Sequence, residues 1–128
     1  MLSFGLYYQN ERKYIMPFLD IRSSKPIDGP TRNKLQLEIG KLMPIIPGKN
    51  VSNTLICISD NYAMYKDAEA KEAIFVDVRL YKNSPEESKK EFAKEFTGLL
   101  ETVLGIPPSA IQMNFVELPN WAVNGEYF

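Results

Sequence analysis

The residue types that most often transfer protons or bind metals are nearly missing from this chain. It contains no histidine and a single cysteine, Cys57. Hydrolases of the Ser-His or Cys-His type need an imidazole base, and one cysteine can neither close an internal disulfide nor build a metal cluster. Any proton-transfer chemistry must therefore use carboxylates, lysines, tyrosines or a terminal amine. No metal site is expected.

The charge and hydropathy of the chain exclude several classes of partner. Its 128 residues predict a single domain, and 15 basic against 16 acidic residues give a net charge of −1. The chain has no basic stripe with interleaved aromatic residues, which argues against nucleic acid. No apolar run is long enough to cross a membrane. The start, Met1 to Tyr8, lacks the basic leader and cleavage site of a signal peptide, so a cytoplasmic protein is expected.

The elements that must position the reactive groups begin with a strand, a helix and a second strand. Alternating polarity predicts a strand over Phe18 to Ser23. The run Asp28-Gly29-Pro30 indicates a helix start with Asp28 or a neighbour as its cap and Pro30 in the first turn. This helix should end at Pro44 and Pro47-Gly48, and its apolar stripe consists of Leu35, Ile39, Leu42 and Ile46. Thr54 to Ser59 is rich in β-forming residues and suits a covered strand.

The second half follows the same order after a polar connection from Asp60 to Glu72. A third strand is predicted over Ala73 to Tyr81. Ser84-Pro85-Glu86-Glu87 indicates a helix start, with Ser84 as N-cap, Pro85 at the first position and Glu87 closing a capping box. Gly105 should end this helix, whose apolar face consists of Phe92, Phe96, Leu99, Leu100, Val103 and Leu104. Ile111 to Leu118 is the predicted fourth strand, and a compact aromatic tail follows over 119–128.

The two halves look like copies of one unit. Residues 18–22 (Phe-Leu-Asp-Ile-Arg) match residues 75–79 (Phe-Val-Asp-Val-Arg) at an offset of 57 positions, 75 − 18. Alternating strands can match by chance, but the shared order of strand, helix and linker favours a duplicated βαβ unit, about 17–60 and 73–118. We therefore predict an α/β (α+β) fold: a four-stranded mixed sheet with two helices on one face. The other face would be bare, and its mixture of Asp, Arg and Phe suits a closed oligomer.

At this point the sequence resembles a known family. Met16-Pro17-Phe18, Ile46-Pro47-Gly48-Lys49, Leu104 to Pro108 and the ending Asn120 to Phe128 are similar in order and spacing to the macrophage migration inhibitory factor group of the tautomerase superfamily. The resemblance covers residues 16–128, a single tautomerase-like domain. It implies a homotrimer with sites between subunits and an N-terminal proline that acts without a cofactor.

The resemblance also implies roles for particular residues. Pro17 matches the proline whose free secondary amine carries a proton between the carbon and oxygen of an enol or α-keto acid. Lys49 matches the lysine that holds the substrate carboxylate. Tyr81 matches a position whose backbone lies beside the substrate, Asn114 of an adjacent subunit matches a substrate-contacting asparagine, and Val123 lies where many relatives have tryptophan.

Taken one by one, these residues also have ordinary structural interpretations. Pro17 could be a strand-edge proline, Lys49 a solvated loop lysine and Asn114 a polar strand residue that faces solvent. The sequence departs from the family as well. Gln112 replaces an aromatic residue, which with Val123 predicts a wider or less aromatic pocket and puts phenylpyruvate in doubt as the preferred substrate. The Cys-x-x-Cys of the animal proteins is absent, so thiol oxidoreductase activity has no support.

The segment Met1 to Ile15 bears on the chemistry directly, because a peptide bond to Met16 would turn the Pro17 nitrogen into an amide. We expect that the functional chain starts at Met16 and is processed to Pro17. The alternative is a retained leader that blocks the proline. The first hypothesis is thus a keto–enol tautomerase of small α-keto acids such as phenylpyruvate, and the second is a catalytically silent trimeric binding or signalling module. A related isomerase or dehalogenase of the same superfamily is a third option.

Overall fold

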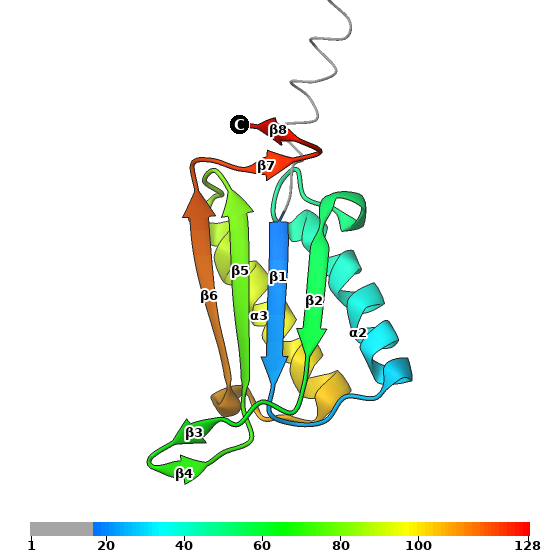
Figure 1. The fold of residues 1–128 in the computed structure, drawn as a ribbon, viewed down its shortest axis with the longest axis vertical. Coiled ribbons are helices and arrows are strands. Elements are labelled where there is room, and N and C mark those ends of the chain that lie inside the picture. Colours follow the sequence, from blue (N-terminus) through cyan, green and yellow to red (C-terminus); the bar gives the residue numbers. More distant parts are fainter. Residues whose placement is uncertain (1–16) are drawn as a thin grey trace, which may run out of the picture.

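The computed structural model describes residues 17–128 as one mixed sheet with two helices packed on one of its faces (Figure 1). The strand order is β2-β1-β5-β6, with β1 parallel to β2, β5 parallel to β6, and β1 antiparallel to β5. Each parallel pair is joined by a helix, so the chain contains two βαβ units side by side. The predicted fold class is confirmed.

The first unit comprises β1 (Pro17–Ser23), α2 (Gly29–Leu42) and β2 (Leu55–Ser59), with the short 3-10 turns η1 (Met43–Ile45) and η2 (Val51–Asn53) before β2. Asp28 caps α2 as expected, because its carboxylate accepts a hydrogen bond from the Thr31 N–H at 2.8 Å.

Two details of the first unit differ from the prediction. The α-helix ends at Leu42, and the buried Ile46 lies beyond both it and η1. The reason is Pro44, which has no N–H to continue the helical hydrogen bonds. β2 is also an edge strand with one open face, on which Leu55 is 56% exposed, and not a covered strand.

The second unit comprises β5 (Ile74–Tyr81), α3 (Glu86–Leu104), the 3-10 turn η3 (Pro108–Ala110) and β6 (Ile111–Leu118). Gly105 ends α3 in the left-handed conformation at φ 67°, as predicted. The prediction of a capping box at Ser84 is wrong. The N-cap is Pro85, one residue later than predicted, and it makes no side-chain hydrogen bond. The Ser84 N–H instead donates to the Glu117 carboxylate on β6.

Two short hairpins project from opposite ends of the sheet (Figure 1). The polar connection contains β3 (Tyr65–Lys66) and β4 (Glu69–Ala70), and the tail contains β7 (Ala122–Val123) and β8 (Glu126–Tyr127). Each has two turn residues with positive φ, which is the two-residue turn that matches strand twist.

The register relates the two units by a local two-fold axis at the centre of the sheet. Asp20 on β1 lies directly opposite Asp77 on β5, and these are equivalent positions in the repeated five-residue segment. On the helix side, alternate strand residues such as Leu19 and Val78 pack against Phe92 and Phe96 of α3 in a core whose members are almost fully buried.

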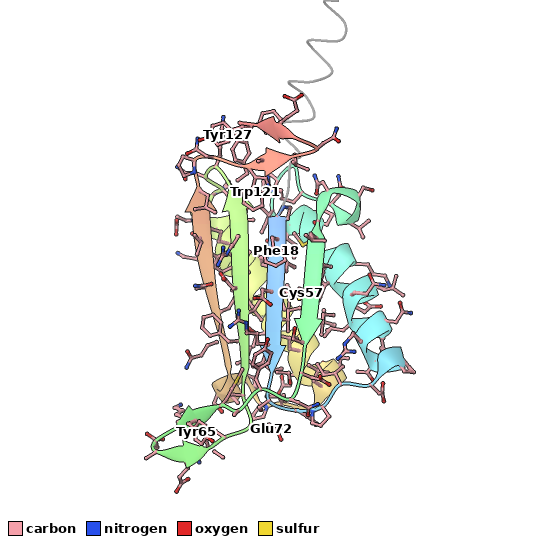
Figure 2. The ribbon with its side chains drawn as sticks, viewed as in Figure 1. Phe18, Cys57, Tyr65, Glu72, Trp121 and Tyr127 are labelled. Atoms are coloured by element: carbon pink, nitrogen blue, oxygen red, sulfur yellow. The ribbon has the colours of Figure 1, made fainter. Side chains whose placement is uncertain are left out.

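The other face of the sheet has no layer over it within residues 17–128, and Figure 2 looks onto it. Its residues form three rows across the four strands: Leu55-Phe18-Arg79-Val116, then Cys57-Asp20-Asp77-Asn114, then Ser59-Arg22-Phe75-Gln112. Arg22 and Arg79 each pair with the aspartate two residues before them at 3.2 Å, so the face is charge-balanced. We call these rows the open face.

None of the helices within residues 17–128 is both long enough and apolar enough to span a membrane.

Candidate functional site

The candidate site lies at the end of the sheet where β1 begins. Pro17 is buried and lies opposite Leu80 of β5, so Tyr81 ends β5 close to the start of β1. Because β2 runs parallel to β1 and its Leu55 pairs with Phe18, the loop that carries Lys49 arrives at this same end. Three of the predicted site residues are therefore brought to one end of the sheet by the parallel pairing of β1 with β2 and its antiparallel pairing with β5.

A turn of regular geometry holds Lys49 in place. The Lys49 N–H donates to the Ile46 carbonyl at 3.0 Å, and Asn50 forms a capping box with Asn53 at the start of η2. This turn packs closely on α2, since a Cβ added to Gly40 would lie 2.8 Å from Cγ2 of Val51. The glycine lets the loop approach the helix.

Burial sets the electrostatics of Lys49. The residue is only 6% exposed, and it is the one lysine among the buried residues of the part of the chain described here. Removal from water disfavours the charged ammonium, so burial lowers the pKa of Lys49 below its usual 10.5. A buried lysine at the mouth of a site can offer both a hydrogen bond and a positive field to an anion.

The tail covers the same end of the sheet (Figure 2). Trp121 and Phe128 close the tail hairpin through two backbone hydrogen bonds of 3.1 and 2.7 Å, and the Phe128 ring lies 6.4 Å from the Tyr81 ring. Val123 is half-buried on β7, at the sheet end where Pro17 lies. The turn Asn124-Gly125, with φ values of 54° and 75°, sets this hairpin, and its sequence is a signal from which the hairpin could have been predicted.

A second cation at this end was missed from the sequence. Lys82 follows Tyr81 with φ 63°, its N–H donates to the Leu118 carbonyl at 2.8 Å, and its Nζ lies 5.3 Å from the centre of the Tyr81 ring. No sequence pattern marks it, because its position depends on the end of β5 meeting the end of β6.

Asn114 does not join this group within one chain. It lies at the middle of β6 opposite Asp77, on the open face. From Pro17 it is two strands across, about 10 Å, and three residues along, about another 10 Å. An amide at that distance cannot contact a substrate held between Pro17 and Lys49 of the same chain. Gln112 is farther still along β6.

The chemistry available at this end is that of a secondary amine, if Pro17 is a chain terminus, beside a buried ammonium group. Within residues 17–128, no group of three or more His, Cys, Asp or Glu side chains is arranged to hold a metal ion. Met16 and the segment before it lie outside the described residues, as does the predicted leader, Met1 to Ile15.

Comparison with known proteins shows one matching family model and several similar folds. The family described as Tautomerase enzyme matches residues 75–128. The structure is similar to MIF2 of Leishmania major, with a TM-score of 0.82 and 21% identity over 89% of this chain and 98% of that one. It is also similar to a macrophage migration inhibitory factor homologue of Prochlorococcus marinus, with a TM-score of 0.74 and 23% identity over 87% and 98%.

A third similar structure is a native fused 4-OT, with a TM-score of 0.77 and 13% identity over 85% of this chain and 94% of that one. No curated protein matches the sequence.

Proposed function

We propose that this chain, which has the tautomerase-superfamily fold of the kind seen in MIF-like proteins, is a cofactor-independent keto–enol tautomerase of small α-keto acids. The observation that carries the proposal is the buried Lys49, with its lowered pKa, at the sheet end where Pro17 begins β1. A processed Pro17 terminus would be the acid/base, and Lys49 would hold the substrate carboxylate.

The proposed reaction needs no oxidant or cofactor. In the direction from keto acid to enol, the neutral Pro17 amine takes a proton from the carbon next to the carbonyl, and the protonated amine then gives a proton to the carbonyl oxygen, which leaves the enol and a neutral amine. In the reverse direction, the neutral amine takes the proton of the enol hydroxyl and returns it to that carbon as the carbonyl re-forms. A secondary amine in water is mostly protonated at neutral pH. Burial of Pro17 and the Lys49 cation would both lower the pKa of the amine into the working range.

Substrate orientation follows from the groups around Pro17. The Lys49 ammonium binds the carboxylate, and the backbone at Tyr81 borders the reacting carbon. Val123 of the tail forms a less aromatic wall than a tryptophan would. Gln112 is too far along β6 to border its own Pro17, so it would enter the pocket of a neighbouring subunit and offer an amide where many relatives have an aromatic residue. Small or polar α-keto acids therefore suit this pocket at least as well as phenylpyruvate.

The assembly we propose is a homotrimer whose sites lie between subunits. The open face carries equal numbers of aspartates and arginines, so it is charge-complementary to a second copy of itself. Oδ1 of Asp77 is buried and finds no hydrogen-bond donor within residues 17–128, which a donor from another copy would supply. Asn114 would enter the site of the neighbouring subunit, because it cannot reach that of its own.

The test compares two purified forms, one starting at Met1 and one starting at Met16 and processed to Pro17, with the terminus verified by intact mass. Ketonisation of enol-phenylpyruvate and of a smaller enol acid is followed by ultraviolet absorbance. We expect activity only in the Pro17 form, and loss of most turnover in its Pro17→Gly variant with the fold retained. Full activity of Pro17→Gly would overturn the role of the proline.

A second function is favoured by one feature of the sequence, the residues before Pro17. With Met16 attached, the proline nitrogen is an amide and cannot act as a base. A chain that retains these residues, and whose pocket is vestigial, would be a silent trimeric binding or signalling module. That function predicts a trimer without turnover in both forms, so the same assay separates the two.

A further inference from the structure

We infer that Glu117 and Lys89 are positioning residues for the candidate site. Their ion pair fixes the turn between β5 and α3, and through this turn it fixes the backbone at Tyr81. The inference deepens the proposed function and rests on it, because Tyr81 borders a reacting carbon only if an α-keto acid binds beside Pro17. Neither Glu117 nor Lys89 is placed at the reacting atoms, so both would act through the turn.

Burial distinguishes this ion pair from the others within residues 17–128. Nζ of Lys89 lies 2.7 Å from Oε1 of Glu117, and the two side chains are only 12% and 20% exposed. In every other ion pair of the described residues, at least one side chain is 39% exposed or more. An ion pair removed from water gains little net stability over apolar residues, because the desolvation of both charges offsets most of their attraction. The pair therefore indicates a role in holding one conformation.

The conformation it holds is that of the turn over residues 82–85. Glu117 lies one residue before the end of β6, and its carboxylate accepts hydrogen bonds from the Ser84 N–H in the turn and from Lys89 in α3. Lys89 also pairs with Glu86 in the first turn of α3, at 2.8 Å. One carboxylate thus joins the end of β6 to the segment that follows β5, and both strands end beneath the tail hairpin (Figure 1). We call Glu117, Lys89 and the bond to Ser84 the clamp.

The backbone of this turn is strained. Lys82 has φ 63°, in the left-handed region where the Cβ of an ordinary side chain is crowded and which asparagine and aspartate tolerate better. Its N–H donates to the Leu118 carbonyl at 2.8 Å, and two residues later the Ser84 N–H donates to Glu117. Strain of this kind persists only where the surrounding structure enforces it, and it is concentrated at functional sites. Two consecutive residues of β6 enforce it here.

The strained turn directly follows the part of β5 that borders the site. Tyr81 is 7% exposed, and its ring has the Lys82 Nζ at 5.3 Å on the turn side and the Phe128 ring of the tail at 6.4 Å. The preceding residue, Leu80, pairs with Pro17 on β1. A turn released from the clamp would let this end of β5 shift against β1. A displacement of about 1 Å near reacting groups can cost about 100-fold in rate. The clamp should therefore matter more for turnover than for stability.

The first test measures kcat/KM for the ketonisation of enol-phenylpyruvate by the Pro17 form. Lys89→Met and Glu117→Met should each lower kcat/KM about tenfold or more, because each removes one side of the clamp. Lys89→Arg keeps the charge and should retain most of the wild-type value. Lys90→Met is the matched control, because Lys90 is 70% exposed and pairs with Glu87 on the same helix. It should leave kcat/KM unchanged.

A second control separates positioning from a general loss of stability. Ile39→Val removes one methyl group from a fully buried residue of α2, which lowers stability without touching the clamp. All variants are assayed under conditions where urea unfolding shows them fully folded. Ile39→Val should then keep the wild-type kcat/KM. A loss of kcat/KM in Ile39→Val as large as that in Lys89→Met would overturn the positioning role.

The second test follows amide hydrogen exchange in the full chain and does not depend on turnover. The N–H groups of Lys82 and Ser84 should be protected in the wild type and should exchange about tenfold faster or more in Glu117→Met. The N–H of Gly105, which bonds to the Glu101 carbonyl at the other end of α3, should exchange at the same rate in both proteins.

The outcomes separate this inference from the proposed function. Unchanged kcat/KM in Lys89→Met and Glu117→Met, beside an active wild type, would overturn the positioning role alone and leave the tautomerase standing. Unchanged exchange at Lys82 and Ser84 in Glu117→Met would show that the clamp does not hold the turn, and would also overturn that role. A wild-type Pro17 form without turnover of any enol acid would overturn the proposed function, and the positioning role with it.

Discussion

Replacing Lys49 by methionine tests the central electrostatic argument. Methionine keeps most of the unbranched stem and removes the buried ammonium group. Because Lys49 is only 6% exposed, its charge carries a desolvation cost that an apolar side chain does not. We therefore expect Lys49→Met to be more stable than the wild type at neutral pH, by about 1–3 kcal/mol. The same variant should be a poorer enzyme.

The stability difference between the wild type and Lys49→Met should depend on pH in a definite direction. Burial lowers the pKa of Lys49 in the folded protein below 10.5, so between the two values the unfolded chain binds more protons than the folded one. The free energy of unfolding of the wild type should then rise with pH across this range, by about 1.4 kcal/mol for each unit of pKa difference. The advantage of Lys49→Met should be greatest near pH 7 and shrink as the pH approaches 10.5.

Catalysis should change in the opposite direction. Loss of a charge-assisted hydrogen bond to the substrate carboxylate is worth about 1.5–3 kcal/mol, which is about a 10- to 150-fold fall in kcat/KM. Without the Lys49 cation the Pro17 amine should also have a higher pKa, so the acid limb of the rate profile should move to higher pH.

The assay is urea unfolding of the Pro17 form at several pH values from about 7 to 10, followed by Trp121 fluorescence, with enol turnover measured in parallel. Lys34→Met, at an exposed position of α2, is the control and should leave both quantities nearly unchanged. A Lys49→Met protein that is less stable than the wild type at pH 7, or a stability difference independent of pH, would refute the desolvation argument.

Three further predictions concern stability, measured by urea unfolding. Gly98→Ala should raise the free energy of unfolding by about 0.5–1 kcal/mol, because nothing lies within 4 Å of the added Cβ. Gly40→Ala should lower it by about 1–3 kcal/mol, because the added Cβ clashes with Val51. Equal effects of the two substitutions would contradict the close packing of Val51 on Gly40. Phe96→Ala should cost about 3–5 kcal/mol, because the ring is fully buried, while a loss below about 1 kcal/mol would show that the core is mispacked. Burial acts to raise the pKa of Glu117, but the hydrogen bonds from Lys89 and the Ser84 N–H outweigh it, so this pKa is lowered in the folded protein. The stability that Glu117 contributes is therefore present above about pH 4.5 and is lost as the pH falls through the pKa of the folded state. Glu117→Gln should lose less stability than the wild type on acidification, and parallel curves of stability against pH would exclude the pairing of Glu117 with Lys89.

Much of the fold could be predicted from the sequence because its signals are local. Alternation of polarity determines β1, β5 and β6 to within a residue, and Asp28 and Gly105 mark helix ends that the structure confirms. The shared order of strand, helix and linker in the two halves, with the repeated five-residue segment, predicted two βαβ units. The extension of the first helix to Ile46 and the N-cap at Ser84 were misjudged, the second because a distant partner, Glu117, binds the Ser84 N–H.

The candidate site shows more clearly what the sequence alone could not predict. The parallel crossover from β1 to β2 brings the Lys49 loop to the end of the sheet where Pro17 lies, and the antiparallel pairing of β5 with β1 brings Tyr81 to the same end. Only the tertiary structure decides that Lys49 is buried, that Lys82 lies over Tyr81 and that Asn114 is out of reach of its own Pro17. These facts depend on packing between segments far apart in the sequence. Residue types therefore fixed which chemistry was possible, and the packing of the chain decided where those groups could meet.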